Sequence, residues 1–111
     1  MGRIREFAAV SRVLSPYLHL DWDIDFDSGD DALAAAIQDA DVQHLEAAVV
    51  QMPQLIDLVR FARNELDLNS LFVALGLGYN PSYDGRSRAE WLQYVQSCMT
   101  RELAARTSRG K

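Results

Sequence analysis

One stretch of the chain is dense in side chains that could bind a metal ion or a cationic partner. Residues 19–31 read HLDWDIDFDSGDD, and six of these thirteen residues are Asp. Four of them alternate with large apolar residues: Asp21, Asp23, Asp25 and Asp27. Carboxylate oxygens are the usual ligands of Ca²⁺, and a row of carboxylates also attracts basic surfaces. The pattern therefore suggests a metal loop, a helix cap or a binding face.

The spacing does not fit an EF-hand calcium loop. With Asp23, Asp25 and Asp27 at loop positions 1, 3 and 5, such a loop needs Gly at position 6 and Glu at position 12. The chain has Ser28 and Ala34 at those positions. Two histidines and one cysteine without close spacing do not form a zinc site either. We therefore predict no metal site and no cofactor.

Side chains for nucleophilic or acid–base catalysis are equally sparse. The chain contains no Gly-x-Ser-x-Gly or Ser-x-x-Lys motif and no glycine-rich phosphate loop. Cys98 lies in the apolar-rich last predicted helix, where an inert, partly buried thiol is ordinary. His44 fits a solvated helix surface, and His19 beside Asp21 fits a structural hydrogen bond better than a general base. We predict that the protein is not an enzyme and has no catalytic residues.

A binding face is the third interpretation of the aspartates. In an extended segment, Trp22, Ile24 and Phe26 would lie on one side and the aspartates on the other. The carboxylates would then be about 6.6–7 Å apart, close to the spacing of phosphates along a nucleic acid strand. An inhibitor of an enzyme that binds nucleic acid could use such a row to imitate the phosphate backbone of the substrate. The alternative is a solvated, capped loop that binds nothing.

Charge along the chain favours a basic partner. The net charge is −5, but residues 21–67 carry twelve acids against Arg60 and Arg63, a balance of −10. The last eleven residues have a balance of +3. An acidic body repels phosphates, so direct nucleic-acid binding is disfavoured, whereas a basic protein would be attracted. A charge that only maintains solubility is the other explanation.

Length and composition predict one domain outside the membrane. A chain of 111 residues with 49% hydrophobic residues can fold around a single core. Its one cysteine cannot form an internal disulfide, and no apolar run approaches the length of a membrane span, about 18 residues. We therefore expect a cytoplasmic protein without membrane contact.

The elements that position these residues are predicted to be helices. Apolar residues from Ile4 to Leu14 share one helical face, and Pro16 should end or kink that helix. Residues 17–22 could add a short turn. Ser28 with Asp31 resembles a capping box at the start of the next helix.

Further signals complete an all-α domain. Asp41 can cap a third helix, which we expect to break or kink near Gln51–Pro53. Asp67 or Asn69 starts a short helix that Gly76 or Gly78 ends, and residues 78–86 form a loop. The last helix opens with a capping box of Ser87 and Glu90. The prediction is a single domain of about five or six short helices over residues 1–106, with a frayed basic tail at 107–111.

Two motifs resemble one known family. Residues 17–22 read YLHLDW, with an aromatic following at Phe26, and residues 75–92 read LGLGYNPSYDGRSRAEWL. Both motifs, in this order and with acidic, Leu-rich segments between them, resemble the CdiI immunity proteins of contact-dependent growth inhibition systems of Gram-negative bacteria. The resemblance spans roughly residues 5–103.

The resemblance implies a cytoplasmic antidote that binds and neutralises the C-terminal toxin domain of a cognate CdiA effector. Such toxins are frequently nucleases, some of which cleave transfer RNA. Trp22, Tyr79 and Trp91 then look like core. We place the toxin contacts by charge, with loop aromatics as anchors if they are exposed: Asp23, Asp25, Asp27, Asp30, Asp31, Asp39, Asp41, Glu46, Tyr79 and Tyr83. The alternative function is a small helical regulator that self-associates, and the sequence leaves the oligomeric state open.

Overall fold

The computed structural model describes residues 7–19, 21–62, 64–81 and 85–109 as an all-helical domain, which confirms the predicted fold class. Within these residues there are six helices and no strand. Their bounds are α2 Ala8–Leu18, α3 Trp22–Asp25, α4 Gly29–Asp39, α5 Val42–Arg60, α6 Glu65–Ala74 and α7 Arg88–Arg109. None of the helices in the described ranges is long and apolar enough to cross a bilayer.

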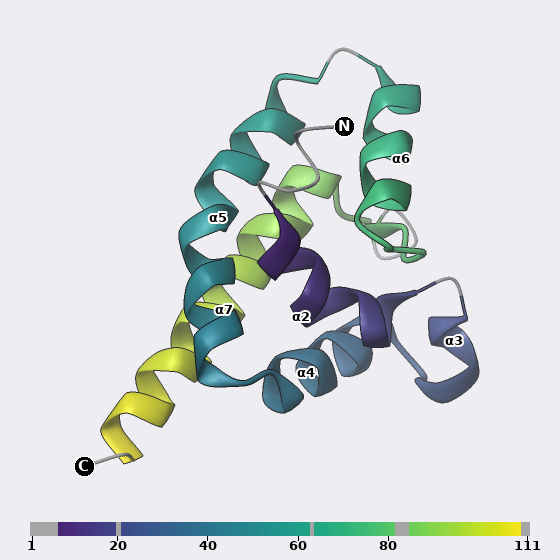
Figure 1. The fold of residues 1–111 in the computed structure, drawn as a ribbon. Helices are drawn as coiled ribbons and strands as arrows, with labels where there is room; N and C mark the ends of the chain where they lie inside the picture. The colour runs from purple at the N-terminus through teal and green to yellow at the C-terminus, as the bar shows by residue number, and fades with distance from the viewer. Residues whose placement is uncertain (1–6, 20, 63, 82–84, 110–111) are drawn as a thin grey trace.

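The core forms around α5, which packs against both α2 and α7, and α4 also packs against α2 and α7 (Figure 1). The last turns of α7 extend beyond the other helices (Figure 1). Large side chains from all three central helices are fully buried; these include Val10, Leu14, Leu45, Met52, Leu55, Trp91 and Leu92. Burial of such side chains is the main source of stability in a domain without disulfides.

Local hydrogen bonds confirm the predicted helix starts of α4, α5 and α7. The Ser28 hydroxyl accepts from the Asp31 N–H at 3.1 Å, and the Asp41 carboxylate accepts from the His44 N–H at 2.8 Å. At α7 the capping box is reciprocal, because the Glu90 N–H donates to the Ser87 hydroxyl and the Ser87 N–H donates to the Glu90 carboxylate.

Gly76 ends α6, as predicted. Its φ is +79°, a left-handed conformation that favours glycine. The Gly76 N–H donates to the Val73 carbonyl and the Leu77 N–H donates to the Phe72 carbonyl, both at 2.9 Å. These are the two hydrogen bonds of a Schellman motif.

Neither proline interrupts its helix, so the predicted end at Pro16 and the predicted break near Gln51–Pro53 are wrong, whereas a kink at either proline stays a prediction. α2 continues past Pro16 to Leu18, and α5 runs unbroken through Pro53 to Arg60. Proline at position 53 leaves the helix without one backbone hydrogen bond, but residues on both sides of it are buried, including Met52 and Leu55. Packing on both sides of Pro53 therefore maintains the helix despite the missing bond.

Two helix boundaries also differ from the prediction. α6 starts at Glu65 rather than after Asp67 or Asn69, because the Asn64 side chain caps it by accepting from the Asp67 N–H at 2.9 Å. Near the C-terminus, α7 continues to Arg109 and so includes part of the segment 107–111 that is predicted to be frayed. Fraying of residues 107–111 itself stays a prediction.

An aromatic cluster joins α3, α6 and α7. The Tyr79 ring lies 5.3 Å from the Trp22 ring and 5.2 Å from the Trp91 ring, and Phe72 lies 5.9 Å from Trp91. Tyr79 and Trp91 are buried and Trp22 is half-buried, in keeping with the core role expected for all three. Gly29 is packed so closely below Tyr79 that a Cβ there would lie 2.2 Å from the Tyr79 Cε1 atom.

Candidate functional site

The aspartate-rich segment is a one-turn helix, not an extended strand. α3 spans Trp22–Asp25, and only its C-cap, Phe26, has extended dihedral angles. On a helix, residues four apart share a face, so Trp22 packs on Tyr79 and Phe26 packs on Tyr17 at 5.8 Å. Ile24 lies between them in sequence and points away, with 77% of its surface exposed. The predicted alternation and its phosphate-like row of carboxylates are therefore wrong.

The first acidic group comprises Asp23, Asp25, Asp27, Asp30 and Asp31. Asp23, Asp27 and Asp31 are exposed, and none of the three pairs with a cation within the described ranges. Asp30 is half-buried and forms an ion pair with Arg86 at 3.3 Å. The side chain of Asp25 lies outside the described part of the structure. Most of the charge in this group thus remains available to a partner.

The second acidic group comprises Asp39, Asp41 and Glu46, and two of its members are used inside the fold. Asp39 accepts a hydrogen bond from the Tyr17 hydroxyl, and this bond raises the pKa of Tyr17. Asp41 accepts from the His44 backbone N–H and also pairs with the His44 ring at 2.7 Å. Arg12 in turn approaches the other ring nitrogen of His44 at 3.0 Å. Within the second acidic group, Glu46 alone is exposed and makes no such contact with a described residue.

The two groups do not form one continuous patch. Asp30 and Asp31 lie in the first turn of α4, whereas Asp39 is its last residue. Nine residues of α-helix separate Asp30 from Asp39, which corresponds to about 13 Å along the helix axis. A partner that contacts both groups must extend along the whole of α4.

Arg106 adds positive charge beside the second group, and sequence reasoning missed it. From α7, its guanidinium donates to the Ala40 carbonyl, to the Ile37 carbonyl at 3.0 Å and to the Gln38 carbonyl at 2.8 Å. Glu102 orients it through a 2.8 Å ion pair. Arg106 thereby caps the C-terminus of α4, where the helix dipole favours a cation. The Glu102–Arg106 spacing is visible in the sequence, but the carbonyls that Arg106 binds lie more than 60 residues away.

The two candidate tyrosines do not form an exposed pair in the described structure. Tyr79 is 2% exposed and packs between Trp22 and Trp91, so it cannot supply contact area to a partner. This corrects its assignment as a toxin-binding residue and keeps its assignment to the core. Tyr83 lies outside the described residues.

The side chains considered for catalysis have structural contacts. The His19 ring accepts from the backbone N–H of Asp21 at 3.0 Å, which fixes the turn between α2 and α3. Cys98 is half-buried, and its hydrogen bond with Tyr94 raises the pKa of that tyrosine. Across the described ranges, no three His, Cys, Asp or Glu side chains are placed to hold a metal ion.

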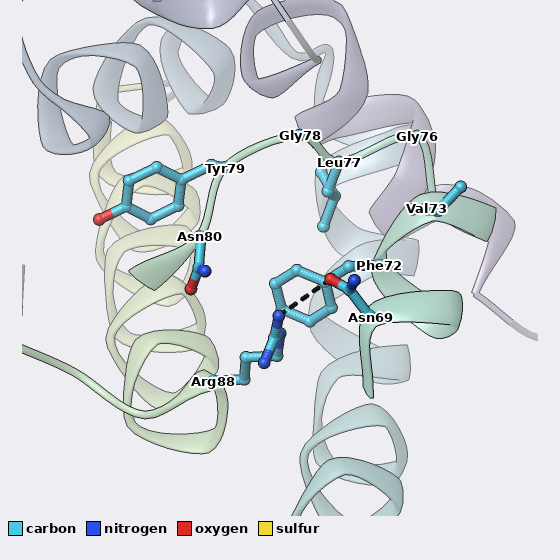
Figure 2. Close-up of a pocket in the computed structure, with 9 residues that line it drawn as sticks. All are labelled: Asn69, Phe72, Val73, Gly76, Leu77, Gly78, Tyr79, Asn80 and Arg88. Atoms are coloured by element: carbon cyan, nitrogen blue, oxygen red, sulfur yellow. Dashed lines mark hydrogen bonds between the residues drawn. The ribbon is translucent and has the colours of Figure 1, made fainter. Parts of the chain in front are cut away.

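A hollow of about 410 Å³ opens between α6, the segment 76–80 and the start of α7 (Figure 2). Phe72 and Leu77 form its apolar walls. Arg88 lies against the Phe72 ring at 5.2 Å and donates to the Asn69 side chain at 3.2 Å. Tyr79 also borders the hollow but turns its ring away from Phe72 and Arg88 (Figure 2).

Replacing Asp41 with alanine is expected to lower the unfolding temperature at neutral pH and to have a smaller effect in acid. Hydrogen bonds from His44 lower the pKa of Asp41 in the folded protein. A carboxylate with a lowered folded pKa stabilises the fold above its unfolded pKa of about 3.9, and this stabilisation is lost as the pH falls through the folded value. Thermal unfolding at about pH 7 and about pH 2 measures the difference.

The control for this prediction is Asp57→Ala, which removes an exposed aspartate from the same helix. It should change the unfolding temperature little at either pH. An equal loss for Asp41→Ala at both pH values would contradict a role for the charged carboxylate.

Comparison with known proteins gives one match. A family model described as CdiI immunity protein matches residues 6–99 of the 111-residue chain. A comparison with curated proteins and one with solved structures gave no match. The matched range contains both motifs of the sequence analysis and all of α2–α6.

Proposed function

The chain belongs to the CdiI immunity protein family, and from this we propose that it neutralises the C-terminal toxin domain of a cognate CdiA effector by covering the toxin's substrate cleft. In this proposal the toxin is a nuclease, a class that includes enzymes that cleave transfer RNA. The inhibitor performs no chemistry of its own and acts in the cytoplasm. The observation that carries the immunity role is the family match over residues 6–99.

The electrostatic part of the proposal is supported by the first acidic group. A nuclease must hold a polyanion, so its cleft is expected to be basic. Asp23, Asp27 and Asp31 are exposed and make no ion pair with a cation in the described part of the chain. Unpaired carboxylates attract a basic surface at long range and raise the rate of encounter. The second acidic group is less suited, because Asp39 and Asp41 bind neighbours within the fold.

The direct test is calorimetric titration of the protein with the toxin domain encoded immediately upstream of its gene, at low and high salt. Tight binding that weakens with salt is the expected result. Tight binding with an affinity that does not depend on the salt concentration would agree with the immunity role but contradict an acidic docking face. Absence of binding would contradict the immunity role and favour the alternative of a self-associating helical regulator.

Charge reversal at Asp23 of α3 and at Asp27, two residues beyond the end of α3, should slow association with the toxin. The double variant Asp23→Lys/Asp27→Lys changes two exposed side chains and is expected to reduce the association rate by about tenfold at low salt and to flatten its salt dependence. Stopped-flow or surface-binding kinetics with the toxin domain measure both quantities.

The matched control is Glu46→Lys/Asp57→Lys, which makes the same charge change at two exposed positions of α5. It should slow association less than Asp23→Lys/Asp27→Lys does. If the two variants behave alike, only net charge matters. If only the α5 variant slows association, the docking face lies on α5 and the proposed location is wrong.

A further inference from the structure

One face of the molecule exposes apolar side chains next to the first acidic group. It is made by α3, α6 and the segment 76–80 between them, and we call it the α3–α6 face. The segment is bound to its neighbours, since Tyr79 packs on Trp22 and the Gly78 N–H donates to the Leu18 carbonyl at 2.7 Å. α3 and α6 lie on the same side of the molecule (Figure 1).

Ile24 is the exposed apolar group on α3. It is 77% exposed although it lies between two aromatic residues that pack inward. Because Trp22 and Phe26 hold the single turn of α3 on both sides, Ile24 is presented to solvent in a fixed position. Such preorganisation reduces the entropy that a contact residue loses on binding.

Val73 is the corresponding group on α6. Phe72 points into the core at 2% exposure, whereas Val73, one residue on and about 100° around the helix, is 70% exposed. Its side chain points outward at the edge of the hollow described above (Figure 2). α6 thus carries apolar residues on its exposed side as well as on its buried side. This is typical of a helix whose exposed side is covered by another surface.

The charge around these apolar groups indicates the kind of partner. Asp21, Asp23 and Asp27 are exposed beside Ile24, and Asp67 is exposed on α6. On α3 and α6 the described residues include no basic side chain, and Arg88, which lines the hollow, is 8% exposed and donates to Asn69. A surface with apolar contacts inside an acidic surround is complementary to a basic surface that itself carries apolar side chains.

We infer that the cognate toxin domain docks on the α3–α6 face, with Ile24 and Val73 as apolar contacts and with the hollow receiving one apolar or aromatic side chain of the toxin. This inference rests on the proposed function and specifies its interface. The acidic surround accelerates encounter, and the apolar contacts slow dissociation once the complex has formed. Apolar contacts at the centre of an interface commonly supply most of its affinity.

The test compares three conservative truncations of exposed residues: Ile24→Ala, Val73→Ala and, as the matched control, Val50→Ala. Val50 is 79% exposed on α5, a helix that is not part of this face. Dissociation of each variant from the toxin domain encoded immediately upstream is measured after circular dichroism has confirmed the fold. We expect Ile24→Ala and Val73→Ala each to dissociate about five- to tenfold faster than the wild type, and Val50→Ala to stay within about twofold.

The outcomes separate this inference from the proposed function. If the wild type binds but neither Ile24→Ala nor Val73→Ala changes dissociation, the α3–α6 face is not the interface and the immunity role stands. If Val50→Ala accelerates dissociation as much as they do, the face has no special role and the inference is equally overturned. If the wild type does not bind the toxin domain at all, the proposed function fails and the inference fails with it.

Discussion

Gly29→Ala is expected to destabilise the domain by about 3 kcal/mol, although it adds a single methyl group. The added Cβ would lie 2.2 Å from the Tyr79 Cε1 atom and 2.5 Å from its Cζ atom. The ring cannot move away easily, because it is 2% exposed and is flanked by Trp22 and Trp91. Urea denaturation should show a lower midpoint without a change in the slope.

A double-mutant cycle with Tyr79→Leu identifies the cause of this loss. Removing the ring creates space where the new methyl group would otherwise clash. Tyr79→Leu alone should be destabilising because it empties part of the core. Adding Gly29→Ala to that background should then cost much less than it does in the wild type. If the two losses simply add, contact with the Tyr79 ring is not the reason that position 29 requires glycine.

Pro53→Ala is expected to stabilise the protein by about 2 kcal/mol. Proline lacks the N–H that would donate to the Val49 carbonyl within α5, and its ring disfavours the preceding turn. Alanine restores the hydrogen bond. Part of the gain is offset by the greater freedom of alanine in the unfolded chain, by about 0.4–1 kcal/mol. Pro53 is exposed, so no core packing is lost.

The neighbouring substitution Gln54→Ala is the control, since it changes another exposed position of α5 without affecting the backbone. It should change the free energy of unfolding by less than about 0.5 kcal/mol. Both variants can be compared by chemical denaturation. A neutral or destabilising Pro53→Ala would mean that α5 is interrupted near residue 53, as the sequence alone predicts.

Features that depend on neighbouring residues were predictable from the sequence. The caps at Ser28, Asp41 and Ser87 and the end of α6 at Gly76 follow from side-chain and backbone hydrogen bonds that reach at most five residues along the chain. Helical periodicity likewise identified the all-α class. The cap at Asn64 was missed, although the same logic applies, because Asp67 and Asn69 offered competing starts nearby.

Features that depend on tertiary contacts were not predictable. Pro53 lies within a continuous helix because packing on both sides of it outweighs one missing hydrogen bond. The alternation in residues 21–27 predicted an extended segment, yet Trp22 and Phe26 find aromatic partners one helical turn apart, and the segment folds as a helix. The same contacts leave Ile24 in solvent, although the alternation predicts that it shares a side with Trp22 and Phe26.

The sequence by itself determined the helical class, the starts of α4, α5 and α7, the end of α6, the acidic character of residues 21–67 and the family resemblance, which the family model supports. Only the tertiary structure decided which acidic side chains remain available. It buries Tyr79, engages Asp39 with the Tyr17 hydroxyl of α2, and leaves Asp23, Asp27 and Ile24 exposed. The physical reason is the sequence separation of the interacting residues. Helix caps involve residues only a few positions apart, whereas the exposure of a side chain depends on partners from distant parts of the chain.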